Sequence, residues 1–299
     1  MRTPYLAVLL LVTGCRNAVE AEAQLPLAAF AYDTAAPLNV QLTPQASPLA
    51  GVTLSGITYA SPGGGLVTGV LGVPSTPGPH PGIVLLHGLP GHAQGAMSVE
   101  GLPLVQRGAV VLAINAPWVR RGGLPVFTPQ DSAEQVQLMQ DLQRAVDVLV
   151  ARSDVDRTRL GYVGGSYGGA MGALFAGLER RLRAWVLFVP DGGLVAHFTN
   201  ASGTALGPLA SLDAAARDRW LNAMRPIEPI RFIHRSPPAA GYIQNGRLDQ
   251  LVTVEDAEAL HAAARQPVTI RWYEAGHGLS PAARTDRQTF LAGQLGLSP

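Results

Sequence analysis

Six consecutive residues in the middle of the chain, Gly164-Gly165-Ser166-Tyr167-Gly168-Gly169, constrain the fold more than any other feature. They contain a Gly-x-Ser-x-Gly motif. The segment before them, 160–163, reads as a short buried strand, and the segment after them, 170–176, reads as a helix of small residues. Between a strand and a helix this motif is typical of a nucleophile elbow, a strained turn that exposes a serine hydroxyl. The residues two before and two after the serine must be small, because strand and helix backbones nearly touch there.

The distribution of apolar residues predicts an α/β fold. Two strands around the turn at 62–65 form an antiparallel hairpin, and later strands alternate with helices, which predicts a mostly parallel sheet with helices on both faces. A long helix is expected to begin at Asp131 or Ser132, with Glu134 and Gln135 placed for a capping box. The expected strands are 52–59, 66–73, 83–86, 110–114, 160–163, 184–189, 241–244 and 268–273, and two further helices are expected at 253–264 and 282–295. The stretch at about 192–225 interrupts the alternation and predicts a small cap over the site.

Composition excludes several kinds of chemistry. The 299 residues suffice for one large domain, and a net charge of +1 argues against binding to nucleic acid through phosphate neutralisation. All basic residues are arginines, so a lysine Schiff base and a Ser-Lys dyad are excluded. The only cysteine is Cys15, which rules out an intramolecular disulfide and a cysteine-based metal site.

The N-terminus has the pattern of an export signal. Arg2 precedes an apolar run at 5–12 that is too short to span a bilayer. The segment Val12-Thr13-Gly14-Cys15 resembles the lipobox of bacterial lipoproteins. This resemblance implies a signal peptide at 1–14, a lipid on Cys15, a tether at 15–29 and a domain at 30–299 held outside the cytoplasm at the bacterial cell envelope. The alternative is an ordinary apolar N-terminus that follows a wrongly assigned start codon.

A serine hydroxyl needs a base and an orienting carboxylate to act as a nucleophile. Of the seven histidines, His277 stands in a glycine-flanked loop just past a late strand, where the carboxyl ends of parallel strands form a ligand crevice. Asp249 follows the preceding strand, and the order Ser166, Asp249, His277 is the expected one. Asp191, after the strand at 184–189, is the rival carboxylate. Its other interpretation, which we prefer, is a turn residue beside Gly192.

Two backbone N–H groups are expected to stabilise a developing oxyanion. One belongs to Tyr167, the residue after the nucleophile, and the other to Leu89 in the loop 87–91, because Pro90 has no N–H. His87 is expected to hold this loop. The Tyr167 hydroxyl either points to the same position or packs in the core, and the sequence leaves both open.

From about Phe30 to its end the chain resembles an α/β-hydrolase. Within that superfamily it is similar to the group of dienelactone hydrolases, acetyl-xylan esterases and prolyl-oligopeptidase catalytic domains. The residues that carry the resemblance are those at 87–91, 164–169, 245–249 and 276–278. It implies a Ser-His-Asp hydrolase without metal or organic cofactor. It departs from dienelactone hydrolase, in which a cysteine stands where this chain has Ser166.

Three functions are compatible with this pattern. The first is hydrolysis of small-molecule esters with small or medium acyl groups. The second is a peptidase, which would need paired carboxylates for a peptide amino terminus. The third is a non-catalytic envelope-binding module, which has no need of the retained Ser, Asp and His. Specificity remains open: Arg120 or Arg121 either pairs with a substrate carboxylate or is a solvated rim residue, and His197 and Phe198 either line an acyl pocket or pack the cap on the body.

Overall fold

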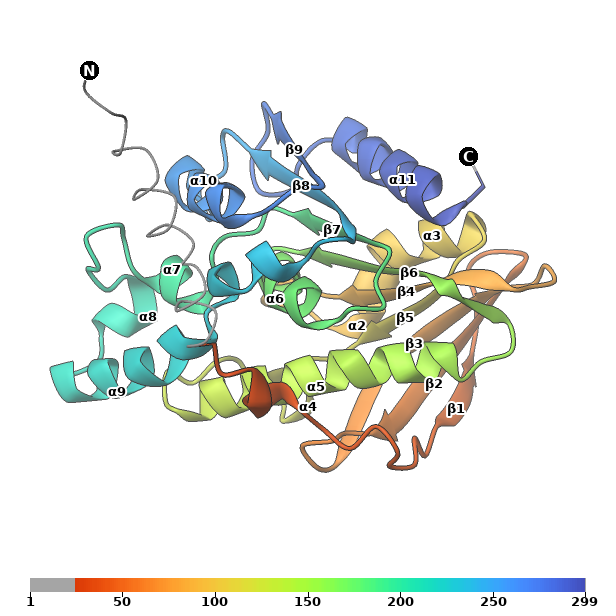
Figure 1. Ribbon diagram of the computed structural model, residues 1–299, viewed down its shortest axis with the longest axis horizontal. Coiled ribbons are helices and arrows are strands. Elements are labelled where there is room, and N and C mark those ends of the chain that lie inside the picture. The colour runs from red at the N-terminus through yellow and green to blue at the C-terminus, as the bar shows by residue number, and fades with distance from the viewer. Residues whose placement is uncertain (1–24, 299) are drawn as a thin grey trace, which may run out of the picture.

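A nine-stranded sheet forms the centre of the molecule in the computed structural model, which describes residues 25–298 (Figure 1). The strand order is β1-β2-β3-β5-β4-β6-β7-β8-β9. The strands are β1 (Gln41–Gln45), β2 (Val52–Ala60), β3 (Leu66–Pro74), β4 (His80–Leu86), β5 (Val110–Ile114), β6 (Val155–Gly165), β7 (Ala184–Phe188), β8 (Ala240–Gly246) and β9 (Val268–Tyr273). From β5 across to β9 all neighbours are parallel. The predicted signal peptide, Cys15 and most of the predicted tether lie outside the described residues.

Ten α-helices surround the sheet in the part of the chain from 25 to 298. They are α2 (Ala93–Ala96), α3 (Leu102–Gln106), α4 (Pro117–Arg120), α5 (Gln130–Val150), α6 (Tyr167–Leu178), α7 (Leu194–Phe198), α8 (Gly207–Ala210), α9 (Ala214–Met224), α10 (Val254–Ala263) and α11 (Pro281–Leu295). None of the helices between residues 25 and 298 is both long and apolar enough to cross a bilayer.

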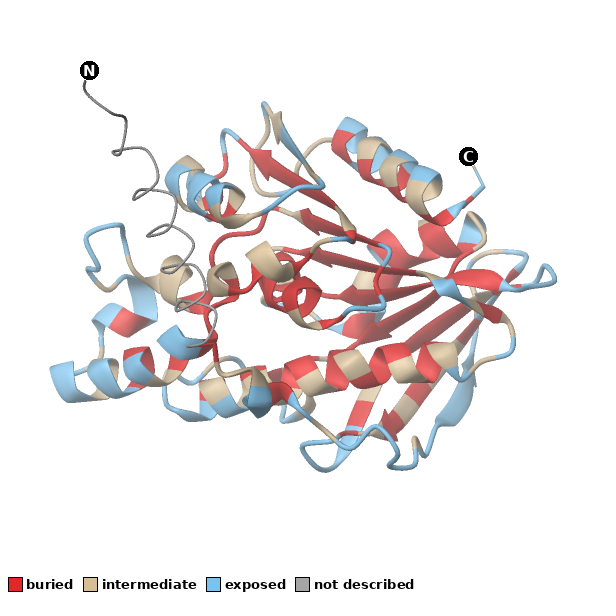
Figure 2. Cartoon of the chain, viewed as in Figure 1, coloured by how far each residue is buried: buried red, intermediate tan, exposed pale blue. Residues whose placement is uncertain are grey.

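The two faces of the sheet carry separate cores, as the alternation of β4 shows. Val84 and Leu86 pack with residues of α5 and α6 on one face. Ile83 and Leu85 pack with residues of α3 and α11 on the other face. Because both faces are covered, every residue of β4 is buried (Figure 2). The predicted α/β-hydrolase architecture, with helices on both faces, is confirmed.

The antiparallel start of the sheet is longer than predicted. The expected hairpin is present, with β2 paired to β3 from Val52–Pro74 to Ala60–Leu66. Strand β1 adds to its outer edge and was not predicted. All five of its residues are exposed, so it lacks the alternation of a half-buried strand (Figure 2). Its Pro44 fits an edge position, where one missing N–H does no harm.

The predicted N-cap residue of the long helix is wrong. Helix α5 follows Pro129 and begins at Gln130, with no side-chain cap. Asp131 lies in its first turn and is buried. Its carboxylate accepts the backbone N–H groups of Val126 (2.9 Å) and Phe127 (2.8 Å) and the indole N–H of Trp220 (2.8 Å). Asp131 therefore anchors a loop and helix α9 through contacts distant in sequence, and it does not act as the N-cap of α5.

The segment between β7 and β8 forms the cap beside the sheet (Figure 1). It contains α7, α8, α9 and three short 3-10 turns that end at Arg235. The prediction placed the cap at about 192–225, and the short helical turns continue from there to Arg235. Trp220 of α9 is fully buried, and Asp213 caps this helix by accepting the N–H of Ala216.

We expect Gly293→Ala in α11 to raise the free energy of unfolding by roughly 0.5–1 kcal/mol, because alanine fixes a helical backbone at lower entropic cost. A Cβ added at Gly293 meets nothing within 4 Å. At Gly241 in β8 an added Cβ would lie 2.1 Å from the buried Trp185 ring, so Gly241→Ala should lower stability by roughly 1–3 kcal/mol. Urea unfolding of both variants checks this, and equal effects would contradict it.

Candidate active site

The serine turn stands where β6 ends and α6 begins. Ser166 has φ 53° and ψ −121°, a backbone conformation that a non-glycine residue rarely adopts. Its N–H donates to the carbonyl of Phe188 at 2.9 Å. A Cβ at Gly164 would lie 2.2 Å from the Gly168 carbonyl oxygen, and one at Gly168 would lie 2.4 Å from the Leu86 carbonyl oxygen. The close approach of strand and helix therefore requires both glycines, as the motif predicts.

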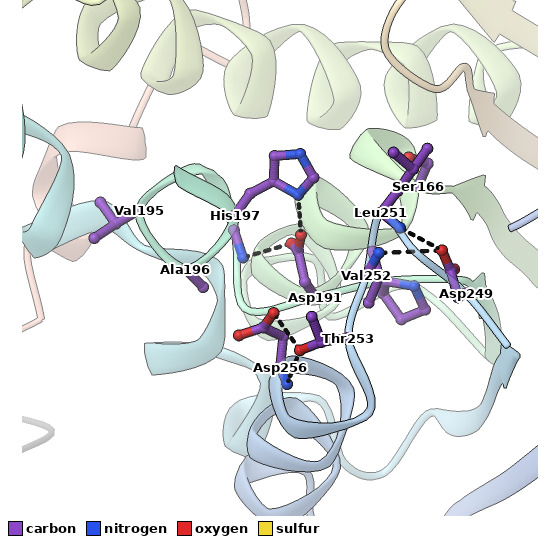
Figure 3. A network of polar contacts seen from close by, with 12 residues as sticks. Ser166, Asp191, Val195, Ala196, His197, Asp249, Leu251, Val252, Thr253 and Asp256 are labelled. Atoms are coloured by element: carbon purple, nitrogen blue, oxygen red, sulfur yellow. Dashed lines mark hydrogen bonds and ion pairs between the residues drawn. The ribbon is translucent and has the colours of Figure 1, made fainter. Parts of the chain in front are cut away.

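The three residues proposed from sequence order meet in one hydrogen-bonded chain. The Ser166 hydroxyl lies 2.9 Å from His277 Nε2, and His277 Nδ1 lies 2.8 Å from Asp249 Oδ2. When Nδ1 keeps its proton and donates a hydrogen bond to the carboxylate, Nε2 carries no proton and can accept the one from serine. The other Asp249 oxygen accepts the backbone N–H groups of Leu251 (2.8 Å) and Val252 (3.1 Å) (Figure 3). The Asp249 side chain has no solvent exposure, so it is held in place from both sides.

Asp191 serves a different histidine. Its Oδ2 lies 2.8 Å from His197 Nδ1, and its Oδ1 accepts the N–H of Gly193 at 2.9 Å, as the preferred turn interpretation requires (Figure 3). The hydrogen bond to this carboxylate raises the pKa of His197. The sequence identified both residues, but not their pairing.

His87 fastens the loop that faces the serine turn. Its Nδ1 donates to the Gly88 carbonyl at 2.7 Å and its Nε2 accepts the Ala116 N–H at 3.1 Å. Burial lowers the pKa of His87 to about 4, which keeps the ring neutral as these two bonds demand. A Cβ at Gly88 would lie 3.5 Å from Ser166 Cβ, so the loop is packed against the nucleophile. These contacts agree with the expected loop-holding role.

Leu89 and Tyr167, the expected oxyanion donors, border one cavity of about 270 Å³ together with Ser166. Within residues 25–298 neither backbone N–H has a hydrogen-bond partner. For Tyr167 this follows from its place as the first residue of α6. Its ring packs edge-on against Trp118 with 5.7 Å between centroids, and burial raises the pKa of its hydroxyl. Of the two alternatives for this side chain, the structure has the packed one.

A second cavity, of about 410 Å³, also borders Ser166 and is lined by His277. Its lining includes a buried ion pair in which Arg287 donates to both oxygens of Glu100, at 2.5 and 3.0 Å. Arg284, half-exposed, lies 3.3 Å from the same carboxylate. Sequence reasoning missed this cluster, because 187 positions separate Glu100 from Arg287 and no local pattern links them.

The arginines considered for substrate binding are used elsewhere. Arg120 pairs with Asp141 at 2.5 Å and donates to the Leu66 carbonyl. Arg121 pairs with Glu134 at 2.6 Å. Neither arginine lines a cavity that contains Ser166. The interpretation as a clamp for a substrate carboxylate therefore has no geometric support.

Both cap residues considered for a pocket border cavities. His197 lines the cavity of about 270 Å³ beside Ser166. Phe198 lines an apolar cavity of about 400 Å³ and packs edge-on against Phe127, with 4.9 Å between ring centroids. No three His, Cys, Asp or Glu side chains between residues 25 and 298 are grouped as metal ligands.

A buried carboxyl group supports the helix that carries His197. Glu228 Oε1 accepts the N–H groups of Val195 (3.0 Å) and Ala196 (3.1 Å) of α7. No side chain or backbone group in the described chain bonds its Oε2. Burial raises the pKa of Glu228 to about 8, so the group is predominantly protonated at neutral pH.

Residues 128–292 match the model of the prolyl oligopeptidase family, which is more than half of the chain. The acetyl xylan esterase from Paenibacillus sp. R4 superposes with a TM-score of 0.70 at 20% identity over 93% of both chains. Acetyl xylan esterase 1 from Thermoanaerobacterium sp. JW/SL YS485 gives 0.69 at 15% identity, over 92% of this chain and 93% of that one. A prolyl endopeptidase gives 0.62 at 19% identity, over 85% of this chain and 40% of that one. No curated protein matches the sequence. At these identities the superpositions establish the α/β-hydrolase fold.

We expect protein stability to fall between pH 5 and 8.5 because of Glu228. The folded protein holds this proton with a pKa of about 8, against an ordinary value of 4.5. The resulting stabilisation is complete below the lower value and is lost as the pH rises through the higher one, at about 1.4 kcal/mol per unit of pKa difference. Glu228→Gln keeps an uncharged acceptor and should remove this dependence. Thermal melts across the range check it, and parallel curves for the two proteins would refute it.

Proposed function

Since the chain belongs to the prolyl oligopeptidase family and is a serine hydrolase, we propose that it cleaves carboxylic esters of small or medium acyl groups through an acyl-enzyme on Ser166. The observation that carries this proposal is the hydrogen-bonded chain from Ser166 through His277 to Asp249, at the meeting point of two cavities. A hydroxyl, a base and an orienting carboxylate in this geometry are the components of acyl transfer.

In the first half of the reaction Ser166 Oγ attacks the acyl carbon while His277 Nε2 takes its proton. The carbonyl oxygen becomes an oxyanion, and we assign the N–H groups of Leu89 and Tyr167 to stabilise it. The bond to the alcohol oxygen then breaks, and that oxygen receives the proton from His277. Asp249 stabilises the imidazolium throughout. Its second oxygen accepts two backbone N–H groups, which hold the carboxylate in the position that orients His277.

In the second half a water molecule takes the place of the alcohol. His277 removes one of its protons, the resulting nucleophile attacks the acyl carbon, and Ser166 leaves with a proton returned by His277. The acid product departs and the free enzyme is restored.

The carboxylates near Ser166 favour ester over peptide substrates. Recognition of a peptide amino terminus needs carboxylates that are free to pair with an ammonium group. Asp191 is tied to His197, and Glu100 is tied to Arg287 and Arg284. These are the acidic residues of the two cavities that meet at Ser166. The superposition with two acetyl xylan esterases over most of the chain supports the same choice.

We expect Ser166→Ala to lower turnover of p-nitrophenyl acetate by about 10⁶-fold and Asp249→Asn by about 10⁴-fold, the latter because the wrong imidazole tautomer then faces the serine. Asp191→Asn is the matched control. It should lose far less, because Asp191 contacts His197 and not His277. Steady-state kinetics measure all three. Comparable losses at Asp191 and Asp249 would contradict the triad, and faster cleavage of aminoacyl anilides than of esters would favour the peptidase.

We also propose that Cys15 carries a lipid that holds the enzyme at the cell envelope, from the Val12–Cys15 pattern alone. The full chain expressed in bacteria should then partition into the detergent phase of a cloud-point extraction, because acyl chains bind the micelle. Cys15→Ser should move to the aqueous phase. Aqueous partitioning of the unaltered chain would refute the anchor.

A further inference from the structure

The two cavities at Ser166 divide the proposed chemistry between them. His277 lines the cavity of about 410 Å³ and not the smaller one. Leu89 and Tyr167 line the cavity of about 270 Å³ and not the larger one. Ser166 and Pro90 are the residues common to both. The proposed base therefore lines one cavity at Ser166, and the two residues proposed to supply the oxyanion donors line the other.

This division assigns the two halves of an ester. The departing alcohol oxygen must take its proton from His277 Nε2, so the alcohol belongs in the cavity that His277 lines. The acyl chain leaves the same tetrahedral carbon in a different direction. The space available to it is the smaller cavity, whose walls include the apolar side chains of Leu89, Leu194 and Leu251.

A third cavity, which we call the cap trough, adjoins the smaller one. Leu89 lines the trough and the smaller cavity but not the larger one, whereas Pro90 lines all three. The trough has a volume of about 400 Å³, and its remaining walls are the segment 124–127, Phe198 and Pro208. Every lining residue is apolar. Two of them, Leu124 (52% exposed) and Val126 (40%), present alkyl side chains to solvent that a bound chain would cover.

The trough wall is fixed by buried contacts. The Asp131 carboxylate holds the N–H groups of Val126 and Phe127 and, through the Trp220 indole, the cap helix α9. Phe127 is kept at φ 56°, a strained conformation for a bulky residue and one that tends to occur at functional sites. The trough is therefore a built feature of the fold.

We propose that the cap trough is the acyl subsite and that it binds a straight alkyl chain of medium to long length, which passes from Ser166 between Leu89 and the cap. This assignment rests on the proposed ester hydrolysis and extends it beyond small acyl groups. Each methylene buried in the trough should raise kcat/KM by about fourfold, which is the transfer free energy of one CH₂ expressed as a rate ratio.

The test is a series of p-nitrophenyl esters from acetate to decanoate, in which the alcohol stays constant. For the wild type we expect kcat/KM to rise by about fourfold per methylene beyond butanoate until the trough is filled. Leu124→Asp places a charge at the trough and should lower the decanoate-to-acetate ratio by at least about tenfold. Val126→Asp is a second variant with the same expectation. Both positions are exposed, so the fold should tolerate them, and thermal melts verify this.

Two matched variants complete the design. Leu206→Asp changes a cap leucine of similar exposure (43%) that lines none of the three cavities, and it should keep the wild-type ratio. Val99→Asp changes an exposed residue of the cavity assigned to the alcohol. It should keep the acyl ratio and alter the ranking of acetate esters of different alcohols.

A wild type that cleaves the acetate but shows a flat or falling chain-length profile would overturn the acyl assignment and leave ester hydrolysis intact. If Val99→Asp abolished the chain-length dependence and Leu124→Asp did not, the acyl chain would lie in the larger cavity. That result would also overturn the acyl assignment. Failure to cleave any ester, in a folded wild type that reacts with aminoacyl anilides, would overturn both the proposed function and this inference.

Discussion

The contact between the backbones of β6 and α6 is the constraint on which the rest of the site depends. A Cβ at Gly164 would meet the Gly168 carbonyl oxygen, so the end of β6 and the first turn of α6 touch across the turn that contains Ser166. That turn forces Ser166 to a positive φ, and the hydrogen bond from its N–H to Phe188 ties it to the neighbouring strand. The strain is balanced by a buried core on both faces of the sheet.

With the serine fixed, the order of strands places its partners. The loops after β4, β7, β8 and β9 carry Leu89, Asp191, Asp249 and His277, and all of them leave the carboxyl edge of the sheet at which β6 ends. Parallel pairing therefore brings residues up to 111 positions apart in sequence close enough to form a hydrogen-bonded chain. Asp191 shows how selective this placement is, because one strand nearer to the serine its carboxylate meets a different imidazole.

The sequence predicted what depends on local pattern and on strand order. Apolar runs located eight of the nine strands, and the Gly-x-Ser-x-Gly motif with the later Asp and His located the residues that meet. Predictions failed where distant contacts decide. Strand β1 has no buried face to generate a pattern, and Asp131 serves a loop and a cap helix instead of its own helix end. For Arg120, whose role the sequence left open, the partner Asp141 lies 21 positions away. The Glu100–Arg287 pair has no local signal of any kind.

The buried Asp131 has a consequence for how the cap works. By holding the 126–127 backbone and the Trp220 indole at once, it joins helix α5, the trough wall and α9 into one body. A ligand that enters such a body meets a surface already in its final shape and orders few side chains on arrival. Under the proposed acyl assignment, the trough discriminates among acyl chains by dimensions that are set when the protein folds.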